Sequence, residues 1–220
     1  MYGFICPWTI QGESLMKTVA IYLAAGMSSR MGRDKLSLPT KAGPVGGLAF
    51  AEVIRSKVEH ILVITRTETV PGWMPERFTK QPEAARWTQI TCRHAWKGQA
   101  HSISEGILQA ELRGAEAVLI LLADQPLVSE KMINAALEIF EDPAEPATDI
   151  VITSYNGIYA PPVVFSEKLF SDLLKLKGDE GAKSIIHRHE RKRILTADPR
   201  NLLDIDNEED YRRLLEITGG

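Results

Sequence analysis

The chain has 220 residues and carries 26 Lys and Arg against 29 Asp and Glu, which gives a formal net charge of −3. Its hydrophobic fraction of 44% and charged fraction of 25% are typical of a folded globular protein and exclude an intrinsically disordered chain. The nearly neutral charge offers no basic surface for duplex nucleic acid, so we expect no nucleic-acid partner. The two cysteines cannot form a disulfide framework, which favours a reducing, cytoplasmic location.

The sequence predicts neither a membrane segment nor a signal peptide. The longest apolar run, Ala117–Ala123, is far shorter than the roughly 20 residues that a membrane-spanning helix needs. Residues 1–15 lack the basic start and the long apolar stretch of a signal peptide. We interpret residues 1–15 as an N-terminal extension and residues 16–220 as one domain.

From Thr18 onward, strand-like and helix-like segments alternate. Continuous apolar runs indicate strands that are buried on both faces of a sheet, and apolar residues at helical spacing indicate helices packed on it. In the first half we expect a strand at Val19–Ala25, a polar loop at Gly26–Lys35, a helix at Gly47–Lys57, a strand at His60–Thr65, a proline-rich loop at Pro71–Pro82, a strand at Gln89–His94 and a helix at Gln99–Arg113.

The second half continues the alternation. We expect a strand at Val118–Ala123, a helix capped by Ser129, a strand at Asp149–Tyr155, a short strand at Pro162–Phe165, a helix capped by Ser166, a loop and helix at Gly178–His189, a strand at Arg191–Ala197 and a final helix capped by Asn207. Such alternation predicts βαβ units, hence an α/β domain with a mostly parallel sheet. Ligands of such domains bind beyond the carboxyl ends of the strands, here after Ala25 and after Ala123.

The loop after the first strand has the chemistry of a phosphate site. It reads LAAGMSSRMGRDK from Leu23 to Lys35. Small residues allow backbone N–H groups to approach an anion, while Arg30 and Lys35 add positive charge. The sequence contains neither the G-x-x-x-x-G-K-[ST] loop nor the G-x-G-x-x-G loop. The alternative interpretation is a strand-to-helix turn with exposed charges.

Acidic residues stand at two further places. Asp124 directly follows the most apolar strand, a position suited to a hard cation such as Mg²⁺; the alternative is a residue that starts a turn. Asp204 and Asp206 occupy alternate positions near the C-terminus. We expect their side chains to point to opposite faces, so that only one of them joins Asp124. Helix capping by Asp206 or Asn207 is the alternative role.

These motifs together resemble a known family. LAAGMSSRMGRDK is similar to the L-A-[AG]-G-x-S-x-R-M-G-x-x-K signature of the MobA-like nucleotidyltransferases that act on molybdenum cofactor. LLADQP, GDEGAK and DIDNEEDY resemble motifs of its cytidylyltransferase branch, in the same order. The resemblance extends from Lys17 to about Leu215. It implies a single Rossmann-like, GT-A-like nucleotidyltransferase domain with helices on both faces of the sheet.

The resemblance also implies roles for individual residues. The backbone of the first motif would contact the base and the triphosphate, Arg30 and Lys35 would neutralise the triphosphate as catalytic groups, and Asp124 and Asp206 would bind Mg²⁺. The implied nucleotide site comprises Leu23, Ala24, Ala25, Gly26, Arg30, Lys35, Ser102 and Asp124, and the implied acceptor site comprises Gly178 and Lys183. For Ser102, a helix-turn residue or a surface hydroxyl is an equally weighted alternative.

Some residues depart from the family pattern or receive no site role. Ala160-Pro161-Pro162 replaces the usual Gly-x-Pro, which puts the shape of the acceptor pocket in doubt. The spacing of the histidines predicts no metal site. We interpret Trp73, Trp87 and Trp96 as packing or loop anchors rather than stacking platforms.

The implied reaction transfers CMP from CTP to the terminal phosphate of molybdenum cofactor (molybdopterin) and releases pyrophosphate, with a molybdenum hydroxylase as the client enzyme. Three alternatives stay open: a guanylyltransferase that uses GTP, a cytidylyltransferase for another phosphorylated alcohol, and a carrier without chemistry. Arg30, Lys35, Asp124 and Asp206 argue against the carrier, since delivery alone needs no metal-binding acids.

Overall fold

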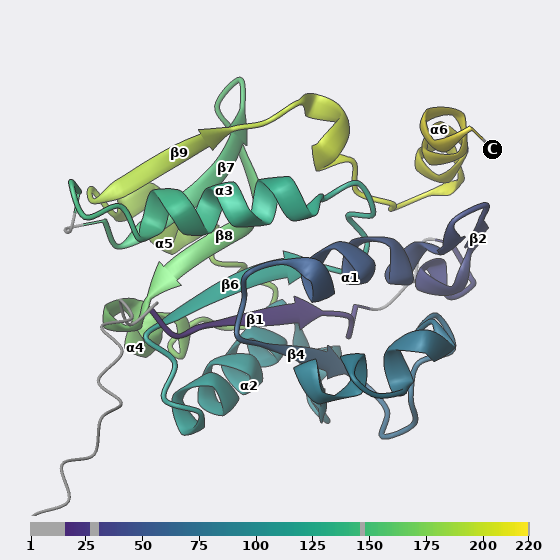
Figure 1. Ribbon diagram of the computed structural model, residues 1–220, viewed down its shortest axis with the longest axis horizontal. Coiled ribbons are helices and arrows are strands. Elements are labelled where there is room, and N and C mark those ends of the chain that lie inside the picture. Colours follow the sequence, from purple (N-terminus) through teal and green to yellow (C-terminus); the bar gives the residue numbers. More distant parts are fainter. Residues whose placement is uncertain (1–15, 27–30, 146–147, 220) are drawn as a thin grey trace, which may run out of the picture.

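The computed structural model describes residues 16–26, 31–145 and 148–219. The described residues form a seven-stranded sheet in the order β5-β4-β1-β6-β8-β7-β9, and β2 pairs with β3 in a small separate ribbon (Figure 1). The strands are β1 (Thr18–Leu23), β2 (Pro39–Thr40), β3 (Gly43–Pro44), β4 (His60–Thr65), β5 (Trp87–Thr91), β6 (Ala117–Leu122), β7 (Ile150–Tyr155), β8 (Ile158–Ser166) and β9 (Lys192–Thr196).

Six α-helices lie within the described residues: α1 (Val45–Arg55), α2 (Gln99–Leu112), α3 (Glu130–Phe140), α4 (Phe170–Leu173), α5 (Lys183–Arg188) and α6 (Glu208–Thr218). A short 3-10 turn, η1 (Lys35–Ser37), precedes β2. None of the described helices is long and apolar enough to cross a membrane.

The expectation of a mostly parallel sheet is confirmed. β1 pairs in parallel with β4 and β6, β4 with β5, and β7 with β9. Within the described sheet, β8 alone runs antiparallel to both of its neighbours, β6 and β7. The arrows of β1, β6 and β9 point to the right in Figure 1, whereas the arrow of β8 points to the left. The carboxyl ends of the parallel strands therefore share one edge of the sheet.

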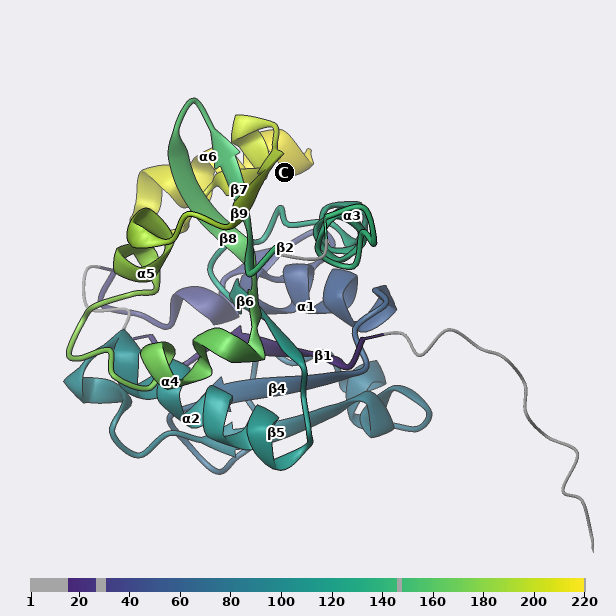
Figure 2. The same cartoon turned by 90° about the vertical axis from the view of Figure 1, so that its left-hand side faces the viewer.

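Helices cover both faces of the sheet, as expected (Figure 2). Alternation along β1 explains why both faces are apolar, because Ala20 and Tyr22 face one side while Val19 and Ile21 face the other. On the first side they pack with α1 and α3, and on the second with α2, α4 and α5. The central strands β1, β4 and β6 are buried on both faces and read as continuous apolar runs for that reason.

Several elements differ in their bounds from the sequence prediction, such as the strand expected at Gln89–His94, which is β5 at Trp87–Thr91. Two of the differences have a clear local cause. The first helix starts at Val45 rather than Gly47, because Pro44 takes the extended N-cap position directly before it. The strand expected at Pro162–Phe165 is longer and begins at Ile158, because Asn156 and Gly157 adopt φ values of 48° and 79°. An Asn-Gly pair with positive φ forms a tight hairpin turn, so β7 and β8 make one hairpin.

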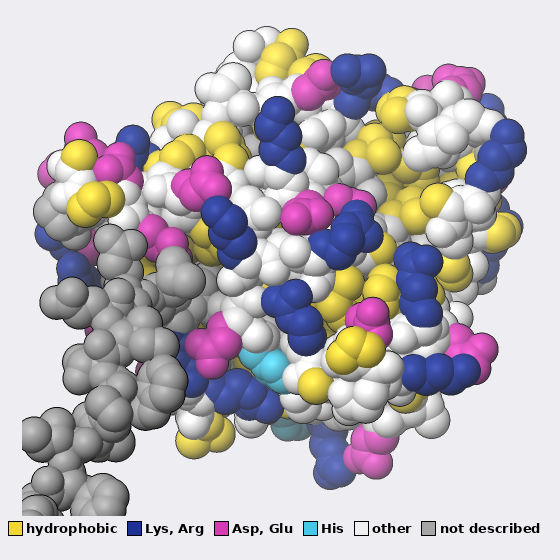
Figure 3. All heavy atoms as spheres, viewed as in Figure 1, with side chains coloured by type: hydrophobic (Ala, Val, Ile, Leu, Met, Phe, Trp, Pro, Cys, Tyr) yellow, Lys and Arg dark blue, Asp and Glu magenta, His cyan; other side chains and the backbone are white. Residues whose placement is uncertain are grey.

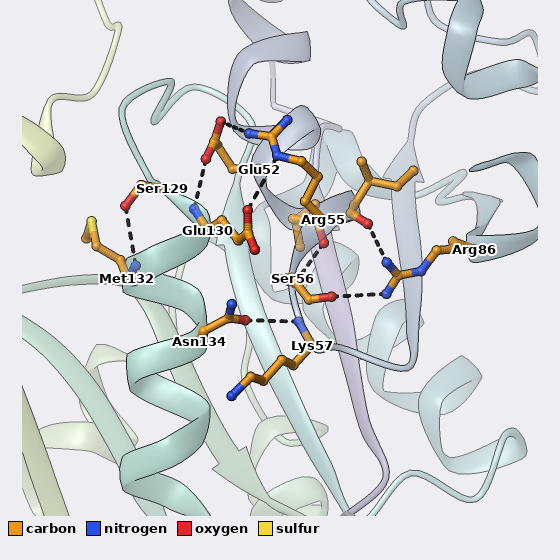
Figure 4. A network of polar contacts seen from close by, with 11 residues as sticks. Glu52, Arg55, Ser56, Lys57, Arg86, Ser129, Glu130, Met132 and Asn134 are labelled. Atoms are coloured by element: carbon orange, nitrogen blue, oxygen red, sulfur yellow. Dashed lines mark hydrogen bonds and ion pairs between the residues drawn. The ribbon is translucent and has the colours of Figure 1, made fainter. Parts of the chain in front are cut away.

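A polar network joins the end of α1 to the start of α3 (Figure 4). The backbone N–H of Glu130 donates to the Glu52 carboxylate over 2.9 Å, and Arg55 pairs with both acids. Arg86 donates from its guanidinium to the carbonyls of Ile54, Ser56 and Val58, which lie in and directly after the last turn of α1. The network holds the two helices beside the loop that carries Asp124.

We expect Arg86→Ala to lower the free energy of unfolding by about 1–3 kcal/mol, because three carbonyl oxygens of a half-buried segment lose their donor. Urea denaturation followed by circular dichroism measures the change. The matched control is Arg93→Ala, since Arg93 pairs with Glu68 in full contact with solvent; its effect should stay within about 0.5 kcal/mol. Equal effects of both variants would contradict the structural role of Arg86.

Candidate active site

The candidate site lies where β1 and β6 end. The parallel ladder continues one residue beyond each strand, since Ala24 N donates to Ile64 O at 2.9 Å and Ala123 N donates to Leu23 O at 3.1 Å. A cavity of about 430 Å³ opens beyond this edge. Its lining includes Leu23, Ala24, Ala25, Gly26, Lys35, Trp96, Gly98, Gln99, Ser102, Leu122, Asp124 and Asp179.

Lys35 lies at the centre of the polar wall of this cavity. Its ammonium nitrogen is 2.6 Å from Asp124 Oδ2 and 3.2 Å from Asp206 Oδ1. The side chain is only 12% exposed. The turn η1 positions it: the Asp34 side chain accepts from Leu36 N at 3.2 Å, and the buried Leu36 packs into the core. The loop after β1 therefore places the Lys35 ammonium group beside two acids from distant parts of the chain.

The electrostatics keep Lys35 charged. Burial lowers the pKa of Lys35, but charge interactions and hydrogen bonds with Asp124 and Asp206 outweigh it, and the pKa lies above its ordinary value. The ammonium group therefore stays protonated throughout the physiological range. A fixed positive charge of this kind can stabilise an anionic ligand, but it cannot serve as a general base.

The segment with Asp204 and Asp206 corrects one expectation. The side chains were expected on opposite faces, but alternate residues of an extended chain point to the same side. Leu203 and Ile205 are buried against α6, which turns both acids towards Asp124. A hydrogen bond of 2.9 Å from Ile205 N to Asp124 O fixes this arrangement.

Asp204 differs from Asp206 in its contacts. Its carboxyl is hydrogen-bonded by Gln125, whereas Asp206 contacts Lys35. Although the residue as a whole is exposed, desolvation of its carboxyl by the surrounding protein, followed by the charge of Asp124, raises the pKa of Asp204 to about 6. A carboxyl with this pKa takes up a proton as the pH falls through about 6, which lowers the negative charge of the site.

Asn207 confirms the capping prediction for the last helix. Its side chain accepts from the backbone N–H groups of Glu209 and Asp210. The Asp210 side chain in turn accepts from the backbone N–H of Asn207, which completes a capping box. Asp206 N also donates to the Asp210 carboxylate, at 3.0 Å. The cap therefore stabilises α6 and orients the acid beside Lys35 at the same time.

A second cavity of about 220 Å³ adjoins the first. The two share Leu23, Gln99, Leu122 and Asp179 in their linings. The remaining walls of the second cavity are mostly apolar and come from β6, β7, β8, α2, α5 and the loop before α5: Ile103, Ile120, Ile152, Tyr159, Ala160, Pro161, Val163, Gly181, Ala182, Lys183 and Ile186. The site thus has a polar chamber beside an apolar chamber.

The structure brings most of the expected site residues together. Every expected nucleotide residue except Arg30 lines the first cavity, and Asp206 joins it through Lys35. Ser102, only 5% exposed, lies on the first turns of α2. Lys183 lines the second cavity, and Gly178 packs against Gly98. Arg30 lies outside the described residues.

Sequence reasoning missed several lining residues. Trp96 was interpreted as an anchor, but its side chain is 64% exposed at the rim of the first cavity. Trp73 and Trp87 do pack, around Phe50. Gln99 and Asp179 also line the first cavity. The GDEGAK motif contains Asp179, and the expected nucleotide residue Ser102 lies three positions after Gln99.

Two of the histidines, His187 and His189, contact other side chains of the domain. His189 bonds the buried Asp149 at 3.0 Å, and the rings of His187 and Tyr159 lie 5.3 Å apart. Burial raises the pKa of Asp149, but contacts with His189, Arg191 and Lys168 outweigh it and leave that pKa below its ordinary value. Within residues 16–26, 31–145 and 148–219, no group of three or more His, Cys, Asp or Glu side chains is arranged to hold a metal.

The comparison with protein families decides the classification. Residues 20–193 match the model of the MobA-like NTP transferase domain. The chain belongs to this family. It is therefore a nucleotidyltransferase of the MobA-like type, as the sequence motifs indicated.

The relatives of this chain differ in name. The purine catabolism protein PucB of Bacillus subtilis is 36% identical over 197 residues, which cover 88% of this chain and 93% of that protein. A probable molybdenum cofactor guanylyltransferase of Mycobacterium avium is 25% identical, with 91% and 96% covered. The crystal structure of Rv0371c from Mycobacterium tuberculosis has a TM-score of 0.71 at 25% identity, with 91% and 99% covered.

We expect Lys35→Ala to reduce nucleotide transfer by about 10²–10³-fold, the usual cost of removing one group from a preorganised charged site. Steady-state kinetics with pyrophosphate detection measures the loss. The control is Lys80→Ala, because Lys80 is an exposed lysine that pairs with Glu76. If Lys35→Ala has wild-type kinetics and an unchanged circular dichroism spectrum, Lys35 does not contribute to nucleotide transfer.

Proposed function

We propose that the protein is a cytidylyltransferase that transfers CMP from CTP to the terminal phosphate of molybdenum cofactor. The observation that carries the proposal is the pairing of Lys35 with Asp124 and Asp206 at the wall of the first cavity. This places a fixed positive charge and two carboxylates beside a loop of small residues, which is a suitable environment for a triphosphate.

The proposed reaction needs little general acid–base catalysis from the protein. A phosphate oxygen of the acceptor attacks the α-phosphorus of CTP, a new P–O bond forms, and the bond to the pyrophosphate breaks. Because the nucleophile is already an oxyanion, no side chain has to remove a proton. Lys35, together with Arg30, offsets the negative charge that moves to the pyrophosphate, and the cavity walls hold the reactants in line.

The acids fit a divalent cation. Both carboxylates approach one ammonium nitrogen within 3.2 Å, so their oxygens converge closely enough to share a cation. Carboxylate oxygens are the ligands that Mg²⁺ prefers, and phosphate oxygens and water would complete its shell. When bound, Mg²⁺ would supply further positive charge at the phosphates. Asp124 and Asp206 would hold it.

The second cavity is the proposed acceptor site. Its apolar walls suit the flat ring system of a pterin, and Lys183 supplies a positive charge for the acceptor phosphate. The name of PucB connects that protein with purine catabolism. We extend this connection to the present chain: its client would be a molybdenum hydroxylase that oxidises purines.

A guanylyltransferase is the second candidate, because the Mycobacterium avium relative bears that name. By resemblance, Ala24-Ala25-Gly26 favours cytosine over guanine, although a methyl group discriminates weakly between ligands. Ser102 and the backbone of the first motif are the groups available to read the edge of the base.

We expect CTP to give a higher kcat/KM than GTP, and ATP to be a poor substrate, because fixed hydrogen-bonding groups read one base edge. Mass spectrometry of the products formed from molybdenum cofactor, Mg²⁺ and each nucleotide tests this directly. A tenfold or larger preference for GTP would assign the protein to the guanylyl branch. Absence of any dinucleotide product with all three nucleotides would refute the proposed reaction.

We expect turnover to require Mg²⁺ or Mn²⁺ and to stop in EDTA. Asp124→Asn and Asp206→Asn should each lower kcat by about 10²-fold or more, since each removes a charged ligand of the cation. Asp204→Asn should have the smaller effect, because its carboxyl bonds Gln125 rather than Lys35. Full activity in EDTA, or a larger loss with Asp204→Asn than with Asp206→Asn, would show that the cation site is misplaced.

A further inference from the structure

At Gly98, the start of α2 touches the loop 178–183 backbone to backbone. Gly98 precedes α2 with φ of +123°, a conformation that L side chains rarely adopt. A Cβ atom at this position would lie 2.2 Å from the carbonyl carbon and oxygen of Gly178 and 2.6 Å from Asp179 N. Real contacts of this kind need well over 3 Å. Only glycine lets the two segments approach so closely.

Two further contacts join the same segments. Ala100 N donates to Gly178 O over 3.0 Å. A Cβ atom at Gly181 would lie 2.9 Å from the side-chain oxygen of Gln99. The loop and the start of α2 thus meet at three places within a few residues, so the loop takes its position from the helix.

This contact separates the two chambers of the site. Gly98 and Ser102 line the first cavity, whereas Gly181 and Lys183 line the second. Asp179, next to the contact, lines both. A nucleotide in the first cavity would therefore lie against the same helical turn that carries the wall of the second.

We propose that Gly98 is a positioning residue that couples the two cavities: it seats the loop 178–183 on the first turn of α2 and so sets the geometry of acceptor binding. The proposal rests on the proposed function for the identity of the acceptor, but not for the coupling itself. Gly98 acts through the loop and does not contact the reacting atoms.

Substitution of Gly98 tests the coupling, because an added Cβ atom would press against Gly178 and Asp179 of the loop. In Gly98→Ala the loop must move by about 1 Å to relieve it, and displacements of this size cost up to about 10²-fold where reactants must be aligned. We expect KM for molybdenum cofactor to rise at least about tenfold, and by a larger factor than the dissociation constant for CTP, which calorimetry measures. Gly72→Ala is the matched control, since a Cβ there meets nothing within 4 Å.

A second measurement needs no acceptor. In the wild-type protein, CTP should slow amide hydrogen exchange in the peptide that contains residues 177–183, because the nucleotide stabilises the turn on which this loop rests. In Gly98→Ala this slowing should disappear, and in Gly72→Ala it should persist. Should Gly98→Ala fail to fold, Gly181→Ala takes its place: there the only clash is with the end of the Gln99 side chain, so the same changes should appear in weaker form.

The outcomes separate this proposal from the proposed function. Suppose that the wild type forms no dinucleotide, yet CTP slows exchange in its loop and does not do so in Gly98→Ala. This result would support the coupling and refute the reaction. Dinucleotide formation with an unchanged acceptor KM in Gly98→Ala would overturn the coupling and leave the reaction intact. The coupling would likewise be overturned if CTP did not slow hydrogen exchange in the loop of the wild type. It would also be overturned if CTP slowed this exchange equally in the wild type and in Gly98→Ala. A parallel loss of CTP and acceptor binding would indicate general distortion and also count against it.

Discussion

The ion pairs of Lys35 are the interaction on which the architecture of the site depends. The lysine follows β1, Asp124 follows β6, and Asp206 precedes α6, so three segments remote in sequence meet at one ammonium group. Without a cation between them, the two acids and the nearby Asp204 would repel each other. The requirement for positive charge at this point explains why the buried side chain keeps its proton despite the cost of desolvation.

The position of this charge follows from the sheet. β1 and β6 are parallel neighbours, which aligns their carboxyl ends and places the residues after them side by side. The C-terminal segment reaches the same point because Leu203 and Ile205 pack with α6 and with residues around β2 and α1. The reversed strand β8 has a different consequence: its hairpin with β7 supplies Tyr159, Ala160 and Pro161 to the second cavity. One sheet thus provides a polar and an apolar chamber side by side.

The charge distribution outside the site is unremarkable by comparison. On the face drawn in Figure 3, basic and acidic side chains are interspersed rather than gathered in a region of one sign. The surface ion pairs on this chain, such as Lys80–Glu76 and Arg93–Glu68, are well exposed and contribute little to stability. The electrostatic specialisation of the protein is therefore local, which agrees with a net charge of only −3.

The sequence by itself determined the strands around β1 and β6, the helices on both faces and the family, because buried parallel strands are continuous apolar runs and the phosphate loop is a contiguous motif. It also indicated which residues gather at the carboxyl edge. Only the tertiary structure decided that the segment with Asp204 and Asp206 turns its acids towards Asp124, that Trp96 lines the first cavity, and that β8 runs antiparallel. It alone revealed the contact between Gly98 and Gly178, since close approach of two backbones 80 residues apart leaves no periodicity in either segment. Local patterns record what each segment buries, whereas the partners of a loop depend on how the whole chain closes.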